Sequence, residues 1–119
     1  MFTKNDSQNF AKDGAIVLRS VISPVWLKRI AEAIDRDISE PAPYCHSYAA
    51  AGGSGKFHGN LRVWETDSDL REFCLYSDLP ELAAKILGSR QINLFYDQLF
   101  VKESGTPNPT PWHNDLPYW

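Results

Sequence analysis

The segment at residues 24–38 carries the strongest periodic pattern in the sequence, and it constrains the fold more than any other feature. Ser23 followed by Pro24 is typical of a helix start, because serine caps the first free N–H groups and proline fits the first helical turn. Apolar residues then recur at helical spacing on one side: Trp26, Leu27, Ile30, Ala31, Ile34 and Ile38. Charged residues occupy the opposite side. A helix of this kind has to pack its apolar side against another element.

Two further helical regions are predicted. Residues 6–13 form a short helix that ends at Gly14. A longer helical region covers residues 67–87, restarts near Pro80 and closes at Gly88. The sequence therefore predicts helices on both sides of the central amphipathic helix.

Strand patterns are fewer. The apolar run at residues 15–18 predicts a buried strand, and residues 91–102 alternate in the manner of a strand. One face of the second strand is expected to carry Ile92, Leu94, Tyr96, Gln98, Phe100 and Lys102. Between residues 40 and 60 the periodicity disappears and glycine and proline accumulate, so we expect a flexible loop there. The pattern as a whole predicts an α+β fold.

The composition argues against nucleic-acid binding and membrane anchoring as functions of this chain. A chain of 119 residues with 43% hydrophobic content forms one small globular unit. The formal charge of -3 offers no basic surface for nucleic acid and no polybasic anchor for a membrane. The first residues lack a secretory pattern and no stretch is long enough to span a bilayer, so we expect a cytoplasmic protein. Cys45 and Cys74 are then expected to be free thiols.

The triplet His113-Asn114-Asp115 is the main candidate for chemistry. Side chains two residues apart in an extended segment point the same way, so His113 and Asp115 are able to converge on one ion. One imidazole and one carboxylate are two of the three protein ligands in the facial triad of non-haem Fe(II) oxygenases. The competing interpretation of the bare triplet is a surface hydrogen-bonded pair.

The surroundings of this triplet are specific. Residues 94–105 and 109–119 closely resemble the phytanoyl-CoA dioxygenase-like family of Fe(II)/2-oxoglutarate oxygenases, and Phe10 with residues 13–19 resembles the opening of its domain. In that family the second histidine ligand, and an arginine that pairs with 2-oxoglutarate, lie downstream of the His-x-Asp. We therefore expect residues 1–119 to be the N-terminal portion of one such domain, with its C-terminal half absent. The resemblance implies the N-terminal part of a double-stranded β-helix, or jelly roll, with helices packed on one sheet.

The resemblance also implies an activity. The family's enzymes are Fe(II)- and 2-oxoglutarate-dependent dioxygenases, so we expect a small-molecule substrate and O2 as reactants and hydroxylation as the outcome. His113 and Asp115 would hold the iron. Related halogenases replace the carboxylate ligand by a small residue, so Asp115 favours hydroxylation over halogenation.

Three residues are candidates for contact with 2-oxoglutarate. By resemblance the strand before the His-x-Asp runs beside the cosubstrate, which suggests Gln98 and Lys102, and relatives place a basic residue near Arg62. For each the alternative is an ordinary surface residue. His46 and His58 precede the His-x-Asp, whereas the family's other ligand follows it, so neither is expected to bind the metal.

Two other function classes stay open at this stage. One is a non-catalytic remnant or interaction module that retains the fold without a working site. The other is a cupin-type jelly-roll metalloprotein in which the same ligands hold a different metal. A jelly roll cut after its first strands leaves apolar surface and strand edges uncovered, so we also expect the chain to self-associate.

Overall fold

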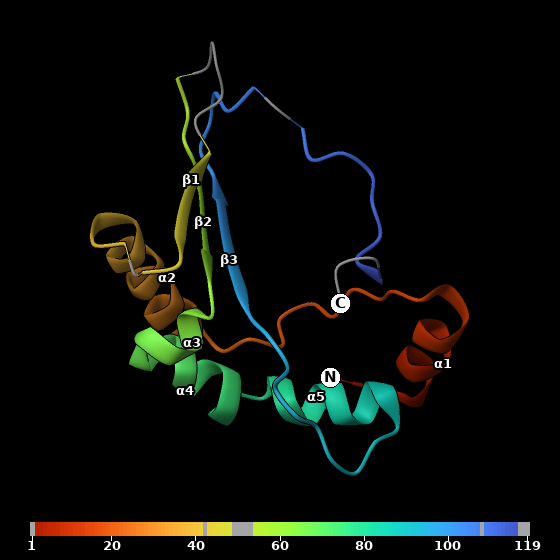
Figure 1. Ribbon diagram of the computed structural model, residues 1–119. Coiled ribbons are helices and arrows are strands. Elements are labelled where there is room, and N and C mark those ends of the chain that lie inside the picture. The colour runs from red at the N-terminus through yellow and green to blue at the C-terminus, as the bar shows by residue number, and fades with distance from the viewer. Residues whose placement is uncertain (1, 42, 49–53, 108, 117–119) are drawn as a thin grey trace.

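The computed structural model describes residues 2–41, 43–48, 54–107 and 109–116, and within them the chain has an α+β architecture (Figure 1). The elements follow in the order α1 (Lys4–Asp13), α2 (Pro24–Ser39), β1 (Cys45–Tyr48), β2 (Phe57–Leu61), α3 (Val63–Thr66), α4 (Ser68–Tyr76), α5 (Leu79–Leu87) and β3 (Gln98–Lys102). The predicted α+β class is confirmed.

Local capping signals set the helix ends. The Ser23 hydroxyl accepts a hydrogen bond from the Trp26 N–H at 3.4 Å, and Pro24 occupies the first turn of α2. Gly14 and Gly88 adopt left-handed conformations, with φ of 74° and 62°, and end α1 and α5. The predicted helices before and after α2 are therefore confirmed, including the restart that separates α4 from α5.

The three strands form one antiparallel sheet in the order β1-β2-β3. The prediction of a loop across residues 40–60 was wrong in this respect, because β1 and all but the last residue of β2 lie within that range. Residues 49–53 lie outside the described part. The strand predicted at residues 15–18 is also wrong: the segment forms no strand, and Val17 is 75% exposed. Of the predicted strand at 91–102, only Gln98–Lys102 is paired.

Helix α2 covers one face of the sheet, as Figure 1 shows. The buried apolar residues are Ala33, Val63 and Leu70, and Ile30 of α2 and Leu99 of β3 pack against them. Because side chains alternate along a strand, Leu99 faces the helix layer while its neighbours Gln98 and Phe100 face the other way. The predicted division of the β3 side chains between two faces is confirmed.

The buried side of α2 differs from the predicted one. Its buried positions are Ala33 and Asp37, whereas Leu27 and Ile38, which the pattern placed on the apolar side, are 55% and 37% exposed. The helix is rotated so that a carboxylate enters the interior. A polar partner for Asp37 must therefore exist beneath the helix.

Ion pairs join α2 to α4. The Asp69 carboxylate accepts hydrogen bonds from Arg29 at 2.5 Å and from Arg36 at 2.6 Å. Arg36 also contacts Asp67, and Arg29 also contacts Glu72. The hydrogen bonds from Arg29 and Arg36 hold the pKa of Asp69 below its ordinary value of 3.8.

This arrangement predicts an acid-sensitive contribution to stability. A carboxylate whose pKa is lower in the folded state stabilises the fold above its unfolded pKa, and that contribution is lost as the pH falls through and below 3.8. We expect Asp69→Asn to be less stable than the unaltered protein in urea at pH 7 and the difference to shrink at pH 3. Asp35→Asn, on the exposed side of α2, controls for the lost charge. An equal difference at both pH values would contradict the assignment.

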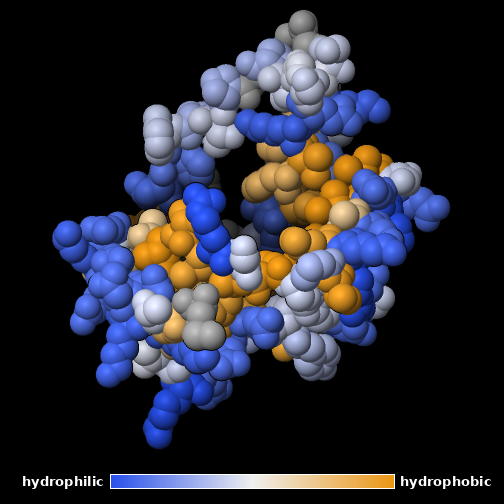
Figure 2. Space-filling view, turned by 180° about the vertical axis from the view of Figure 1, so that it is seen from behind, coloured by the Kyte–Doolittle hydropathy of each residue, from blue (hydrophilic) through white to orange (hydrophobic). Residues whose placement is uncertain are grey.

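The surface is large for a chain of this mass. Its accessible area is 9169 Å², against roughly 6500 Å² for a compact monomer of 13.5 kDa. Hydrophobic side chains spread over much of the face in Figure 2, and Tyr76, Phe95 and Leu116 are at least 75% exposed. Within the described residues no helix is long and apolar enough to cross a membrane.

Candidate functional site

The chain after β3 lies across the sheet from α2. In Figure 1 this segment, drawn in blue, leaves the top of the sheet and descends on the side opposite the helix layer. It carries the candidate ligands His113 and Asp115. The candidate site therefore belongs to the open face of the sheet, which Gln98, Phe100 and Lys102 also face.

A close contact between two turns directs this segment. The Glu103 N–H donates to the Lys56 carbonyl at 3.0 Å, and the Lys56 N–H donates to the Glu103 carboxylate at 2.9 Å. The Thr106 hydroxyl donates to the same Lys56 carbonyl at 3.1 Å. Gly55 lies so close that a Cβ there would be 2.5 Å from the Ser104 carbonyl oxygen. Only glycine fits this crossing without displacing the backbone.

His113 and Asp115 lie side by side, as the spacing predicted. The His113 Nε2 atom is 3.4 Å from an Asp115 carboxylate oxygen, and their side chains are 51% and 74% exposed. The His113 Nδ1 atom is 2.8 Å from the Pro111 carbonyl oxygen. Since a carbonyl only accepts, Nδ1 carries the proton in that contact. Nε2, the nitrogen that faces the Asp115 carboxylate, is then the one that would bind a metal.

His113 borders a cavity of about 720 Å³ that it shares with Phe57, Phe100 and Lys102 from the open face of the sheet. The two phenyl rings contact each other with centroids 5.6 Å apart. The Lys102 ammonium donates to the Thr110 hydroxyl at 2.7 Å and lies 5.0 Å from the centre of the Phe57 ring. The cavity thus joins an imidazole, a cation and an apolar wall, and Figure 2 shows the hollowed face of the molecule.

The structure separates the other two cosubstrate candidates from this cavity. Gln98 shares a strand face with Lys102, but four residues of extended chain put it about 13 Å away. Arg62 makes hydrogen bonds of 2.9 and 2.6 Å to the Glu65 carboxylate, which raise the pKa of its guanidinium. The Arg62 guanidinium also lies 5.7 Å from the centre of the Tyr44 ring. Of the three candidates, the structure brings Lys102 close to His113.

The two upstream histidines lie on strands rather than in a loop. His46 of β1 pairs with Gly59, and His58 of β2 pairs with Ser47. His58 points toward α2, where its Nε2 atom is 2.6 Å from the Asp37 carboxylate. It therefore faces away from His113.

A buried polar cluster on the helix-covered face escaped the sequence patterns. It consists of Asp37, Cys45, His58 and Asn60, of which Asn60 is fully buried and Asp37 nearly so. One signal for it was present in the sequence. Asp37 lies four residues after Ala33 and so continues the buried line of α2 with a charged residue. The strand partners were not visible, because β1 and β2 are polar on the side that faces the helix.

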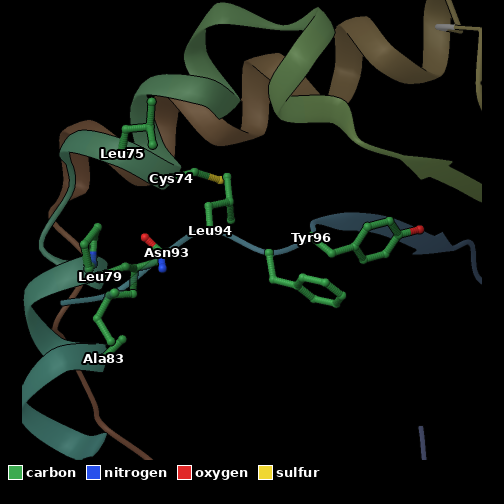
Figure 3. A pocket seen from close by; sticks show the side chains of 10 residues that line it. Cys74, Leu75, Leu79, Ala83, Asn93, Leu94 and Tyr96 are labelled. Atoms are coloured by element: carbon green, nitrogen blue, oxygen red, sulfur yellow. The ribbon is translucent and has the colours of Figure 1, made fainter. Parts of the chain in front are cut away.

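A second hollow, of about 430 Å³, lies between α4, α5 and the segment before β3 (Figure 3). Leu75, Leu79 and Leu94 border it, and the described residues that line it include no charged side chain. Cys74 points into it beside Leu94, as Figure 3 shows. Within the described residues, this hollow therefore offers no cation to pair with a carboxylate.

The donor set at the first cavity fits part of an iron site. Two ligands of one ion with bonds of about 2.1 Å are separated by roughly 3.0 to 3.4 Å, for bond angles between 90° and 109°. The His113–Asp115 distance of 3.4 Å lies within this range. Within the described residues no group of three or more His, Cys, Asp or Glu side chains is arranged to hold a metal. The described residues therefore offer two candidate ligands at this place, an imidazole and a carboxylate.

Comparison with known proteins gives one match. A family model described as phytanoyl-CoA dioxygenase (PhyH) matches residues 10–119, which is more than half of the chain. Neither the curated proteins nor the solved structures contain a significant match.

Proposed function

Because this chain belongs to the phytanoyl-CoA dioxygenase family, we propose that it carries the iron-binding portion of an Fe(II)- and 2-oxoglutarate-dependent dioxygenase that hydroxylates a small molecule. The observation that carries the proposal is the pairing of His113 Nε2 with the Asp115 carboxylate at 3.4 Å, where His113 also borders a cavity. We further propose a jelly roll as the complete domain, with the β1-β2-β3 sheet as part of one of its sheets.

His113 and Asp115 would hold Fe(II), and a third ligand would come from outside the described residues. When bound, the iron and 2-oxoglutarate supply oxidative decarboxylation coupled to hydroxylation of a C–H bond. The Pro111 carbonyl fixes the His113 tautomer. Asp115 would hold the coordination position that related halogenases leave to halide, which favours hydroxylation.

Lys102 is our first candidate for binding 2-oxoglutarate. Its ammonium group lies 5.0 Å from the centre of the Phe57 ring, and Lys102 borders the same cavity as His113. A cation attracts a carboxylate more strongly beside such apolar walls than in bulk solvent. Gln98 and Arg62 remain proposals of lower rank, because Gln98 lies farther along β3 and Arg62 is paired with Glu65.

This ranking predicts a kinetic effect. We expect Lys102→Met to raise the KM for 2-oxoglutarate by about 10-fold to 150-fold, equivalent to roughly 1.5 to 3 kcal/mol for a lost hydrogen bond to a charged group. Gln98→Leu is expected to raise the same KM by less. Lys102→Arg should restore most of the affinity, and Lys12→Met on α1 serves as control. An unchanged KM for Lys102→Met would remove Lys102 from the site.

The activity itself is testable by measuring succinate formation from 2-oxoglutarate by the complete protein. We expect turnover that requires both Fe(II) and O2 and that increases with a suitable substrate. Metal binding without 2-oxoglutarate turnover would favour a cupin-type metalloprotein. The absence of both would favour a non-catalytic interaction module.

The proposed partners are a small-molecule substrate, O2 and a second copy of the chain. The large accessible surface and the exposed Phe95 and Leu116 favour self-association of a protein made from these 119 residues. We expect light scattering to give a mass of at least two chains at micromolar concentration. A monomer of 13.5 kDa at every concentration would contradict this.

A further inference from the structure

The buried polar cluster beneath α2 brings a thiol, an imidazole and a carboxylate into contact: those of Cys45, His58 and Asp37. The Cys45 sulfur lies 3.5 Å from the His58 Nδ1 atom. The opposite ring nitrogen of His58, Nε2, lies 2.6 Å from one carboxylate oxygen of Asp37. The Asn60 side-chain amide donates to the other carboxylate oxygen, also at 2.6 Å. Three elements, α2, β1 and β2, supply these side chains.

The contacts assign a role to each ring nitrogen. The Asp37 carboxylate accepts, so it favours the tautomer with the proton on His58 Nε2. His58 Nδ1 is then a lone pair directed at the Cys45 thiol. The ring is held in this orientation because the side chains of His58 and Asp37 are only 11% and 7% exposed and Asn60 is fully buried. This is the arrangement of a thiol with a positioned general base.

Cys74 provides an internal comparison. Both cysteines are free and half-buried. Burial raises the pKa of both thiols, and a nearby carboxylate, Asp37 for Cys45 and Asp97 for Cys74, adds to the increase. The direction of these pKa shifts is the same for both cysteines, so it does not distinguish them. The difference is the imidazole, since within the described residues no histidine lies at hydrogen-bonding distance from Cys74.

We propose that Cys45 is a site of oxidation to sulfenic acid by hydroperoxides, with His58 as the base that accepts the thiol proton and Asp37 as the residue that positions His58. Cys45 lies on the edge strand β1 and is half-buried, which admits a reagent as small as hydrogen peroxide. The site lies on the opposite face of the sheet from His113. It does not depend on the proposed iron chemistry.

The reaction balances with hydrogen peroxide as the oxidant. The Cys45 thiol transfers its proton to His58 Nδ1, and the sulfur attacks one peroxide oxygen. The S–O bond forms as the O–O bond breaks, and the second oxygen leaves as hydroxide, which takes the proton from His58 to become water. The sulfur loses two electrons and becomes a sulfenic acid, while the peroxide is reduced.

The experiment uses the complete protein treated with hydrogen peroxide and a dimedone probe for sulfenic acid, with labelling of each cysteine followed by mass spectrometry. We expect Cys45 to be labelled at least 10-fold faster than Cys74, and the ratio to fall to about 1 in urea because the cluster is then dispersed. His58→Gln should slow Cys45 labelling at least 10-fold. His46→Gln, on the other face of the sheet, should leave the rate unchanged.

Equal labelling of the two cysteines in the native protein would overturn the proposal. So would a Cys45 rate that His58→Gln leaves unchanged in a folded protein, which circular dichroism would verify. If His58→Gln does not fold, the test is the ratio of Cys45 to Cys74 labelling in the native protein. A ratio of at least 10 that falls to about 1 in urea supports the proposal, and a ratio near 1 in the native protein overturns it.

Discussion

Replacing His113 by alanine is expected to reduce 2-oxoglutarate turnover by more than about 100-fold in the complete protein. Loss of a residue that only supports a metal ligand typically costs 10-fold to 100-fold, so loss of the ligand itself should cost more. The His113 Nε2 atom faces the Asp115 carboxylate and has no substitute in the described part of the cavity rim. Succinate formation at saturating Fe(II) measures the effect.

The control for this variant is Asn114→Ala, which alters the residue between the two ligands and removes neither of them. We expect it to keep most of the activity. Asp115→Ala should abolish hydroxylation as His113→Ala does, and it should keep more of the metal affinity where water or halide fills the vacated position. Near-normal succinate formation by His113→Ala would show that the iron is held elsewhere.

Replacing Asp37 by alanine is expected to lower the free energy of unfolding by roughly 3 kcal/mol. The side chain is 7% exposed, and its loss leaves the hydrogen-bond donors of His58 and Asn60 buried without an acceptor. It also removes the polar link between α2 and the sheet. Urea-induced unfolding followed by circular dichroism measures the change.

A matched control lies on the same helix. Asp35→Ala removes the same group from the exposed side of α2, and we expect a change within about 0.5 kcal/mol. Asp37→Asn retains the shape of the side chain and one oxygen acceptor. We therefore expect its free energy of unfolding to lie between that of Asp37→Ala and that of the unaltered protein. If Asp37→Ala and Asp35→Ala have equal stability, the buried cluster contributes nothing to the packing of α2.

The helix ends were predictable from the sequence because their causes are local. Ser23 with Pro24 begins α2, and Gly14 and Gly88 end helices in left-handed conformations, as predicted. Each signal acts within a few residues of chain, so no knowledge of the tertiary fold is needed. The pairing of His113 with Asp115 follows from the same kind of local geometry.

The strands were less predictable because a strand needs a partner elsewhere in the chain. Residues 15–18 have a suitable composition but pair with nothing, whereas β1 and β2 pair with each other despite their polar side chains. Their polarity is explained by the buried cluster, since His58 contacts Cys45, and both His58 and Asn60 contact Asp37. The face of β1 and β2 that α2 covers therefore lacks the apolar residues that usually identify a buried strand face.

The candidate site was predictable only in part, because its arrangement also depends on contacts between distant parts of the chain. The alternation along β3 correctly placed Gln98 and Lys102 on one face, but it did not show that Lys102 alone would border the cavity with His113. That arrangement depends on the crossing at Gly55 and Glu103, which turns the following segment over the open face. The role of Arg62 in binding 2-oxoglutarate stays a prediction.

Equilibrium binding of Fe(II) under anaerobic conditions measures the proposed metal site apart from turnover and substrate. We expect one Fe(II) per complete protein, a loss of at least 100-fold in affinity for His113→Ala, a clear loss for Asp115→Ala, and no loss for Asn114→Ala. Unchanged Fe(II) affinity in both His113→Ala and Asp115→Ala would show that these residues do not hold the iron.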